Sequence, residues 1–373
     1  MPNYRQITTV QAAAVLVSSI IGVGVLPLPL FAVRAGDAGA PLVTLLGVMV
    51  GFIGLLLITL LGMRFPDKNI IQYSQDIIGR WFAALGSICI IVFFSVLTSL
   101  AAREFGEVVV TSVLKETPLE VTVIVMLMLA AVSTRNNMTT FAYIHLFYFP
   151  FLLLPALLIV SLSLKNADVI NLQPVWGNQP GHMLSGVLTV AALFQGSFVL
   201  TLVIPAMQNP RKAMKASLYG MLISGGLYIV IVIAAVGVFG AEEIKNLLWP
   251  TLELAKATSL PANILERLDA AFLAVWVTAV FTTLFSSYYL TLRAVSTLTG
   301  LKDHNALSFF LLPFVFIMAV IPQNILSMYE TIEGVGRIGL FITSGYPAFL
   351  LILAFIRKKR GDRSHANQVD PIR

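Results

Sequence analysis

Long apolar segments separated by short polar ones run along the whole chain. Most of the apolar segments have about 20 residues, the helix length needed to cross the roughly 30 Å hydrocarbon core of a bilayer. The pattern therefore predicts an all-α polytopic membrane protein that forms a single transmembrane domain over residues 1–373. The expected transmembrane helices, about ten in number, are residues 9–33, 40–63, 82–103, 119–133, 141–164, 185–206, 217–239, 268–298, 305–321 and 336–356.

The composition agrees with this fold class. The chain is 58% hydrophobic and only 11% charged, whereas soluble domains carry about 25% charged residues. The net charge is +6, but the positive residues lie in the loops that flank the membrane and in the tail, so we expect no nucleic acid partner. The single cysteine, Cys89, lies inside an apolar segment, and we interpret it as a small packing residue rather than part of a disulfide or redox site.

The distribution of Lys and Arg predicts how the chain is oriented. Loops on the cytoplasmic side of a membrane carry an excess of these residues. With the N-terminus placed inside, about two thirds of the 24 Lys and Arg residues fall in inner segments. We therefore expect both termini in the cytoplasm, with residues 357–373 as a basic cytoplasmic tail.

Two loops carry patterns of their own. The inner loop 66–80 has isoleucines at near-helical spacing, and we expect it to lie along the membrane surface. The outer loop 240–264 is expected to form two short amphipathic helices joined at Trp249-Pro250. Such a hairpin either caps an outward-facing vestibule or is an ordinary surface loop, and the sequence leaves both interpretations open.

Two of the expected transmembrane helices contain residues that break helices. The first reads IIGVGVLPLPL at residues 20–30, and the sixth has QGS at residues 195–197 near its middle. Glycine costs about 1 kcal/mol and proline about 3 kcal/mol inside a helix, and backbone groups without partners are costly in lipid. The breaks are therefore tolerable only where the freed backbone groups line a cavity inside the protein. The residues concerned are Gly22, Gly24, Pro27, Pro29, Gly196, Pro205 and Pro210.

The two breaks occupy corresponding positions, because each begins a block of five expected helices. We therefore predict a five-plus-five inverted repeat, with residues 1–165 as the first unit and 184–356 as the second. Paired breaks of this kind indicate a transporter-type site near mid-membrane. Free N–H groups at half-helix N-termini suit a carboxylate, and unwound carbonyls suit an ammonium group or a cation, so a zwitterion such as an amino acid fits. The alternative is that the glycines only allow close packing and the prolines only kink the helices.

Two segments resemble a known family: SSIIGVGVLPLP in the first helix and IPAMQNPRKAMKAS at the end of the sixth. Together with the ten helices and the chain length, they resemble the B subunits of spore nutrient germinant receptors, which belong to the amino acid–polyamine–organocation (APC) transporter superfamily. The element Asn209-Pro210-Arg211 resembles the wider superfamily, whereas ten helices combined with Leu-Pro-Leu-Pro are more specific. The resemblance covers essentially the whole chain and implies the LeuT-like fold of that superfamily.

The resemblance also implies a function and partners. A subunit of this kind senses a nutrient within a complex of the spore inner membrane, with an A subunit and a lipoprotein C subunit as partners. Binding of an amino acid or a similar small nutrient then triggers germination rather than bulk uptake. A proton- or sodium-coupled amino-acid transporter of the same fold, and a purely structural membrane scaffold, are the alternatives.

Candidate ligand-binding residues come from the two breaks and from helices three and eight, which usually complete such a pocket. The glycines offer backbone groups, two polar side chains can orient a ligand, and the phenylalanines shape the pocket. Thr283, Ser287 and Thr291 share one face of helix eight, although a lone hydroxyl often bonds only to its own helix. The full set is Gly22, Val23, Gly24, Val25, Thr98, Phe194, Gln195, Gly196, Ser197, Phe198, Thr283, Ser287 and Tyr288.

The other ionisable residues of the expected helices do not indicate a ligand-binding role. No acidic residue lies near the middle of helices one, six or eight, and His145, the only ionisable residue of helix five, is interpreted as structural. The charged residues at the outer ends of helices three and ten are interpreted as ordinary interfacial pairs, with a gate or a partner contact as the alternative. These residues are Arg103, Glu104, Glu107, Glu330, Glu333 and Arg337.

The sequence contains no convincing catalytic or metal-binding constellation. The segment GVGRIG at residues 334–339 matches the G-x-G-x-x-G pattern, but a dinucleotide site needs that pattern between a strand and a helix, and here it enters a transmembrane helix. The four histidines have no partners at ligand spacing, and no pair of nucleophile and base stands out. We therefore expect no cofactor, no metal and no enzymatic activity.

Overall fold

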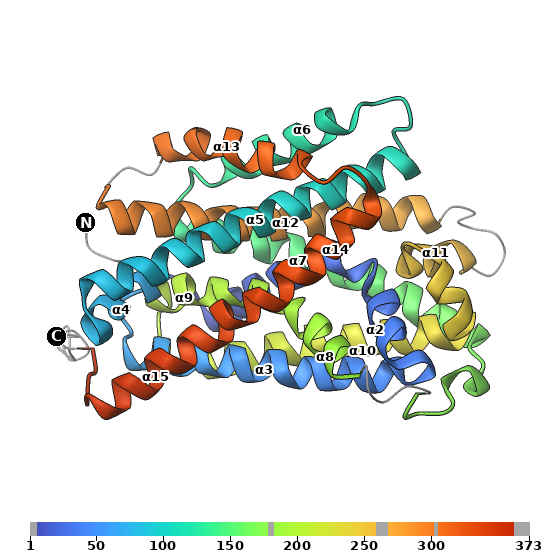
Figure 1. Ribbon diagram of the computed structural model, residues 1–373, viewed down its shortest axis with the longest axis horizontal. Coiled ribbons are helices and arrows are strands. Elements are labelled where there is room, and N and C mark those ends of the chain that lie inside the picture. Colours follow the sequence, from blue (N-terminus) through green and yellow to red (C-terminus); the bar gives the residue numbers. More distant parts are fainter. Residues whose placement is uncertain (1–5, 178–182, 259–267, 302–304, 362–373) are drawn as a thin grey trace, which may run out of the picture.

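The computed structural model describes residues 6–177, 183–258, 268–301 and 305–361. These residues are almost entirely helical, and the β structure among them is limited to an isolated bridge between Ile7 and Met207. The long helices run roughly along the longest axis of the molecule and pack side by side (Figure 1).

The helices follow the predicted segments closely. In chain order they are α1 (Thr9–Ile20), α2 (Leu28–Gly36), α3 (Ala40–Arg64), α4 (Ile70–Ile78), α5 (Arg80–Ser112), α6 (Leu119–Ser133), α7 (Met138–Ser163), α8 (Met183–Ala192), α9 (Leu200–Val203), α10 (Ala213–Asn246), α11 (Pro250–Ala257), α12 (Leu268–Thr299), α13 (Asn305–Val320), α14 (Ile325–Leu340) and α15 (Tyr346–Ile356). Between them lie the 3₁₀ turns η1 (Val23–Val25) and η6 (Gln195–Val199), and a π-helix, η10 (Phe341–Gly345).

The number of membrane-crossing segments agrees with the prediction. Among the described residues, seven helical segments are long and apolar enough to cross a membrane, and three apolar helices, α1, α6 and α13, are shorter. Each of the ten predicted segments overlaps at least one of these, but the first is divided, because α1 is a separate short helix and α2 belongs to the segment Leu28–Arg64. Apart from these first two segments, the ends differ most in the last one, which begins at Ile325 rather than at residue 336.

Both loops that were expected to contain helices do contain them. α4 begins after Asn69, whose side chain caps the helix together with Gln72. Three of its isoleucines are buried against the protein, so its placement along a membrane surface stays a prediction. α10 kinks at Gly240, where φ is +74°, and α11 starts directly after Trp249. The amphipathic hairpin is therefore confirmed, except for residues 259–264, which lie outside the described residues.

The two interrupted helices lie deepest in the bundle. Every residue of α1 from Gln11 to Ile20 is buried. In the segment Met183–Ala206, 78% of the most apolar stretch is buried, against 22–56% in the other long segments. Broken backbone is tolerated at membrane depth only where protein surrounds it, and this position provides that environment.

The interrupted helices run in opposite directions. At the start of α1, the N–H groups of Gln6 and Ile7 donate to the carbonyl of Ala206, each at 3.1 Å, at the end of the sixth segment. At the other end, a Cβ built on Gly186 would come within 2.2 Å of the Cβ of Ala35 in α2. An inverted repeat requires this arrangement, while the repeat boundaries at residues 1–165 and 184–356 stay a prediction.

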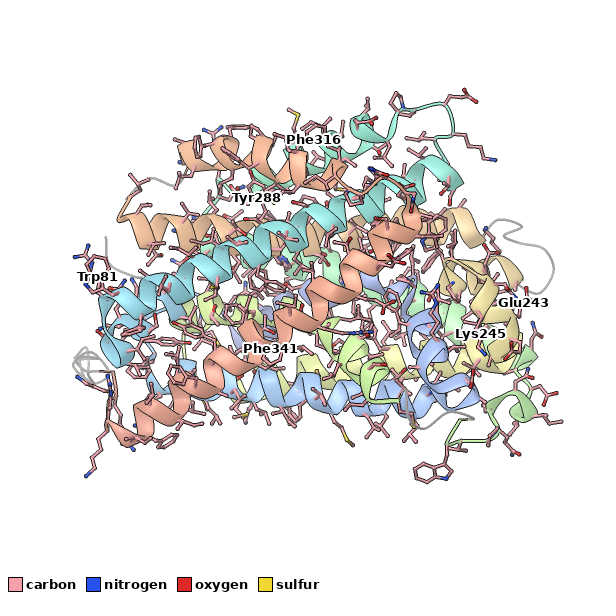
Figure 2. The ribbon with its side chains drawn as sticks, in the orientation of Figure 1. Trp81, Glu243, Lys245, Tyr288, Phe316 and Phe341 are labelled. Carbon is pink, nitrogen blue, oxygen red and sulfur yellow. The ribbon has the colours of Figure 1, made fainter. Side chains whose placement is uncertain are left out.

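The molecule has two distinct ends, here named after the short helices that lie there (Figure 1). The α4 end contains α4 and the exposed Trp81 (Figure 2), and the N–H of Gly361 there donates to the carbonyl of Arg64 at 3.1 Å. The opposite, α11 end contains α11 and an ion pair of 2.7 Å between Lys245 and Asp37.

Candidate functional site

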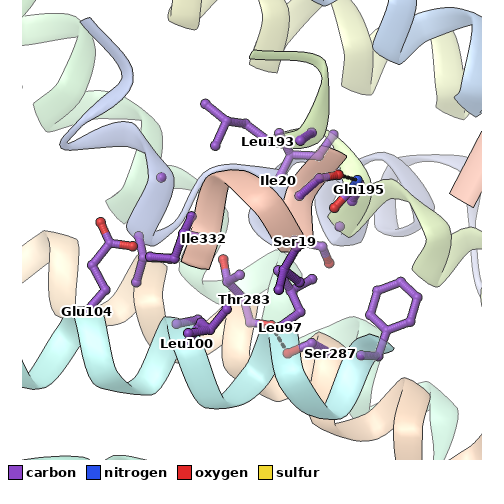
Figure 3. Close-up of a pocket in the computed structure, with 18 of the residues that line it drawn as sticks. Ser19, Ile20, Leu97, Leu100, Glu104, Leu193, Gln195, Thr283, Ser287 and Ile332 are labelled. Carbon is purple, nitrogen blue, oxygen red and sulfur yellow. Dashed lines mark hydrogen bonds between the residues drawn. The ribbon is translucent and has the colours of Figure 1, made fainter. Parts of the chain in front are cut away.

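A cavity of about 90 Å³ lies where the two interrupted helices meet. Its walls come from α1, η1 and α2, from α8 and η6, and from α5, α12 and α14 (Figure 3). Most lining side chains are apolar, and a few polar ones converge among them, which is typical of a small-molecule site. The polar side chains are those of Ser19, Glu104, Thr189, Gln195, Thr283, Ser286, Ser287 and Glu333.

The first break leaves carbonyl groups that neighbouring helices satisfy. Gly22 has φ −153° and ψ −129°, far from helical values, and α1 stops before it. The carbonyl of Ile20 accepts a hydrogen bond from the hydroxyl of Tyr228 at 2.9 Å. The carbonyl of Gly22 accepts one from the indole N–H of Trp276 at 3.3 Å. Side chains from α10 and α12 therefore stabilise the broken backbone inside the membrane domain.

The second break is held by a side chain and by close backbone packing. Gln195 is buried, and its Nε2 donates to the carbonyl of Gly336 on α14 at 2.5 Å. Its Oε1 is buried and has no partner. Gly196 lies against α1, because a Cβ at this position would be 2.0 Å from the carbonyl oxygen of Ser19. Only glycine fits at position 196 without moving one of the two helices.

Both breaks also supply free N–H groups. Gly24 and Gly196 line the cavity, and within the described residues neither N–H group donates a hydrogen bond. Unpaired N–H groups at helix breaks are good donors to an anionic group such as a carboxylate. Each of the two broken helices therefore supplies an unpaired backbone N–H at a residue of the cavity wall.

α12 brings hydroxyl groups to the cavity. The Oγ of Ser286 lies 2.6 Å from the Oγ of Ser19 and 2.8 Å from Nε2 of His145. The hydroxyl of Thr98 donates to the Oγ of Ser287 at 2.8 Å. His145 is fully buried and does not line the cavity, but it contacts the cavity-lining Ser286, so its interpretation as structural stays a prediction.

Glu104 on α5 lies in the cavity wall, although the sequence placed it among the charged residues at the outer end of helix three rather than among the candidate ligand-binding residues. It is only 2% exposed. Its Oε1 accepts a hydrogen bond from the hydroxyl of Tyr329 at 3.2 Å, which in turn accepts one from the indole of Trp249 at 2.7 Å. Arg103 and Glu107 pair with each other at 2.7 Å. The expectation of an interfacial pair is therefore correct for these two residues and wrong for Glu104.

Two sequence features could have identified Glu104. A charged residue inside a membrane segment is a functional candidate by default. In addition, the spacing of Leu97, Leu100, Ala101 and Glu104 places them on one face of a helix, and all four line the cavity. From the sequence, Glu104 was instead grouped with the charged residues at the outer end of helix three, as one of an ordinary interfacial pair.

Charged residues surround the side of the cavity nearer the α11 end. Glu333 on α14 pairs with Arg337 at 3.0 Å and with Arg34 of α2 at 3.8 Å. The Nε of Arg337 also donates to the hydroxyl of Thr189 on α8 at 3.1 Å. The predicted pairing of Glu333 with Arg337 is confirmed. These contacts join three of the helices that enclose the cavity.

The structure divides the predicted ligand-binding residues into two groups. The residues that line the cavity are Val23, Gly24, Gln195, Gly196, Thr283 and Ser287. The residues that surround it without lining it are Gly22, Val25, Thr98, Phe194, Ser197, Phe198 and Tyr288. Most of the apolar lining from α5, α8 and α14 was not predicted from the sequence.

Residues of the second group take part in packing. The ring of Phe198 packs against Phe94, with centroids 5.3 Å apart, and Phe194 packs against Tyr228 at 5.2 Å. Tyr288 points toward α13, where its hydroxyl donates to a backbone carbonyl at 2.5 Å (Figure 2). These side chains support the helices that form the walls.

The structure also bears on the remaining expectations from the sequence. Among the described residues, no three His, Cys, Asp or Glu side chains come together in a way that could hold a metal ion. Cys89 is exposed on the surface of α5. The expected role of Cys89 as a small packing residue is therefore wrong for the contacts within this chain, because this face of α5 points outward.

Comparisons with known proteins agree with this arrangement. A family described as "Spore germination protein" matches residues 6–328 of the chain. The chain is 27% identical over 359 residues to spore germination protein YndE of Bacillus subtilis (strain 168), covering 96% of this chain and 98% of that protein. It is 24% identical over 361 residues to spore germination protein B2 of the same organism, covering 96% and 97%. It is 23% identical over 350 residues to spore germination protein GerLB of Bacillus cereus, covering 92% and 93%.

The fold is similar to that of a solved transporter. The substrate-bound outward-open state of a Na⁺-coupled sialic acid symporter superposes with a TM-score of 0.65 at 9% sequence identity. The superposition covers 91% of this chain and 78% of the symporter chain. At this identity the likeness shows the fold alone. The chain therefore has the LeuT-like, all-α fold of the APC transporters that was expected.

Proposed function

The chain belongs to the spore germination protein family, and from this premise we propose that it is the germinant-sensing membrane subunit of a spore nutrient receptor. It is a multi-pass membrane protein with a transporter-like fold. In the proposed role it resides in the spore inner membrane and binds an amino acid or a similar small nutrient in the cavity. It then signals to an A subunit and a lipoprotein C subunit to start germination.

The observation that carries this proposal is the chemical polarity of the cavity. The free N–H groups of Gly24 and Gly196 offer donors to a carboxylate. Glu104 lines the same cavity, is buried, and has no ion-pair partner among the described residues. Because a buried charge is costly unless it is paired, a ligand that carries an ammonium group complements Glu104. An amino acid carries both groups.

The size and lining of the cavity restrict the ligand further. One group the size of a water molecule needs about 10–15 Å³ of cavity volume. The cavity volume of about 90 Å³ therefore accommodates a ligand of roughly six to nine non-hydrogen atoms. That is the size of a small to medium amino acid. The apolar side chains of Leu97, Leu193 and Ile332 favour an aliphatic rather than a charged ligand side chain (Figure 3).

The contacts of the broken helices support a route for the signal. A ligand held by Gly24 and Gly196 binds the first and sixth segments together, so it favours the conformation in which both N–H groups face the cavity. The start of α1 is bonded to Ala206 at the α4 end. A shift at the breaks is therefore carried to the α4 end, which we place in the cytoplasm because of its Lys and Arg residues.

Binding to purified protein tests this proposal. A panel of labelled L-amino acids is added to the detergent-solubilised chain and to proteoliposomes with and without sodium and pH gradients. We expect saturable binding of a small aliphatic amino acid without accumulation in the proteoliposomes. An absence of saturable binding to any small nutrient would contradict the proposal and favour a structural scaffold.

A coupled amino-acid transporter is the second candidate, because the fold is similar to that of a Na⁺-coupled symporter. The two candidates share the binding site and differ in whether the bound ligand then crosses the membrane. Accumulation of the labelled amino acid that depends on a sodium or proton gradient would establish transport and overturn the sensing role. Binding without such accumulation supports a sensor that needs its partners to act.

A further inference from the structure

A second cavity lies beside the first break, on another side from the main cavity. It has a volume of about 30 Å³, and its walls come from α7, α10, α11 and α12 together with Ile21 and Val25. Ile20, Val23 and Gly24 line the main cavity instead. The broken segment of the first helix therefore separates the two spaces. We call the smaller space the side cavity.

The side cavity is apolar. Its polar side-chain groups are the hydroxyl of Thr251 and the indole N–H of Trp276. Both donors are already used: Thr251 donates to the carbonyl of Val25 at 2.7 Å, and Trp276 donates to that of Gly22 at 3.3 Å. A water molecule in this space would lack the two to four polar partners that it needs, and apolar cavities of this kind stay dry.

The side cavity comes nearest to the outer surface of the bundle at α7 and α12. Ala156 and Val275 are partly buried, whereas the other residues of its lining are buried. The adjacent residues Leu157 and Ala274 are exposed. Because α7 and α12 are long and apolar enough to span a membrane, we expect this surface to face lipid chains rather than water. Hydrocarbon is therefore the chemistry that has access to the cavity.

We propose that the side cavity binds the end of an unbranched hydrocarbon chain, which enters between Ala156 and Val275. On the scale of about 10–15 Å³ for each water-sized group, the volume accommodates roughly two or three terminal carbons. The chain belongs either to a membrane lipid or to a free alkyl compound. The inference does not depend on which ligand the main cavity binds.

Occupancy of the side cavity acts on the first break. The bound chain end packs against Thr251 and Trp276, which hold the carbonyls of Val25 and Gly22. It thereby restrains the side chains that fix the broken segment, and Gly24 of that segment lines the main cavity. The side cavity is thus a regulatory site for hydrocarbon next to the site for the polar nutrient.

Fluorescence of Trp276 tests the proposal directly, because bromine close to an indole quenches its emission. The background is the full chain carrying Trp81→Phe and Trp176→Phe, which removes two exposed indoles. We expect 1-bromobutane to quench part of the remaining emission with a saturable dependence on concentration. Trp276→Phe should abolish this saturable quenching. That result would assign the quenched emission to Trp276 rather than to Trp249.

Matched replacements of alanine by leucine show where 1-bromobutane binds. Ala279→Leu and Ala156→Leu fill the side cavity from α12 and α7, and each is expected to weaken the saturable quenching at least about fivefold. Ala274→Leu makes the same change at an exposed position of α12 and should leave the quenching unchanged. Equal quenching in all three variants, or quenching that rises without saturation, would overturn the proposal. Elution as a single folded species and an unchanged melting temperature show that each variant is folded.

The source of the chain is distinguished in nanodiscs. One preparation contains phosphatidylcholine with brominated acyl chains, and the other contains the same lipid without bromine plus 1-bromobutane. Quenching of Trp276 by the brominated lipid identifies an acyl chain as the occupant, and quenching by 1-bromobutane alone identifies a free alkyl compound. Either result supports the hydrocarbon site, and quenching by neither contradicts it. Amino-acid binding measured on the same samples shows whether the main cavity is intact.

Discussion

Gly196 packs directly against the carbonyl of Ser19, so that a Cβ at position 196 would lie 2.0 Å from that oxygen. The hydroxyl of Ser19 also bonds to the carbonyl of Val15 at 2.7 Å and to Ser286 at 2.6 Å. Ser19 is therefore fixed on several sides, and the two broken helices meet backbone to backbone at the cavity. This close approach of the helices occurs at Gly196, whose free N–H group we assign to the ligand.

Replacement of Gly196 by alanine should abolish ligand binding without preventing membrane insertion. An ordinary contact distance is 3.4–4 Å, so the helices must separate, and the position of Gly196 relative to Gly24 in the cavity wall changes. We expect the dissociation constant to rise at least about tenfold, equivalent to 1.4 kcal/mol. Gly226→Ala is the control, because nothing lies within 4 Å of the added Cβ. Normal binding by Gly196→Ala would show that the site is elsewhere.

The hydroxyl of Thr283 should contribute to ligand affinity. It lines the cavity, and its distances to the carbonyls of Ser18 and Ile21 are long, at 3.4 and 3.5 Å, so it can turn to a ligand. Thr283→Val keeps the shape and removes the hydroxyl, with an expected loss of about 0.5–1.5 kcal/mol, or roughly 2- to 13-fold in affinity. Thr278→Val is the matched control on the same helix, since Thr278 bonds to its own helix at 2.7 Å. Equal affinity in both variants would remove Thr283 from the ligand contacts.

His145 should contribute to stability rather than to binding. Its ring is buried among aromatic side chains, 4.3 Å from the centroid of Phe141. Removal of a buried ring costs about 3–5 kcal/mol, so His145→Ala should lower the melting temperature of the purified protein markedly. Ligand affinity, measured well below that temperature, should change less than threefold. Lost binding with unchanged stability would assign a functional role to His145.

The sequence was sufficient for the fold because each of its signals is local. The length of an apolar segment predicts a membrane helix, and the glycines and prolines near Gly22 and Gly196 show where the backbone cannot continue as a helix. Free backbone in lipid is so costly that both breaks had to lie in the interior, as they do. The helical spacing of the isoleucines in loop 66–80 and the break at Trp249-Pro250 were recognised from local patterns in the same way, whereas the cap at Asn69 was not predicted.

The cavity lining was predicted only in part, because it depends on how each helix is rotated against its neighbours. Thr98 and Tyr288 are polar residues on the expected helices, but the first bonds to Ser287 and the second points toward α13. Periodicity defines the faces of a helix without indicating which face meets the cavity. Glu104 was likewise expected to pair with a charged residue close to it in the sequence. In the structure, the nearby Arg103 and Glu107 pair with each other instead.

The orientation of the chain makes a labelling prediction. Cys89 is replaced by serine, and one cysteine is introduced at Asn136, in the turn before α7 at the α4 end, or at Trp176, near the α11 end. Both positions are exposed. A membrane-impermeant maleimide added to intact bacterial cells should label Trp176→Cys and leave Asn136→Cys unlabelled until the membrane is permeabilised. The reverse pattern would place the α4 end outside and contradict the expected cytoplasmic termini.

Replacement of Glu104 by glutamine should weaken the binding of ligands that carry an ammonium group. Glutamine keeps the shape and can still accept the hydrogen bond from Tyr329, so the wall of the cavity is preserved while the charge is removed. Hydrogen bonds to charged groups contribute about 1.5–3 kcal/mol, which predicts a loss of roughly 10- to 150-fold in affinity. The measurement is equilibrium binding of the amino acid that binds the unmodified protein most tightly.

A ligand without the amino group distinguishes loss of the ion pair with Glu104 from a general disruption of the binding site. The carboxylic acid that lacks only the ammonium should bind the unmodified protein weakly, because it leaves Glu104 buried and unpaired, and Glu104→Gln should bind it at least as well. Glu330→Gln, at an exposed position of α14, should leave both affinities unchanged. If Glu104→Gln weakens the amino acid and its deaminated analogue to the same degree, the carboxylate does not recognise the ammonium group, and the zwitterion assignment is wrong.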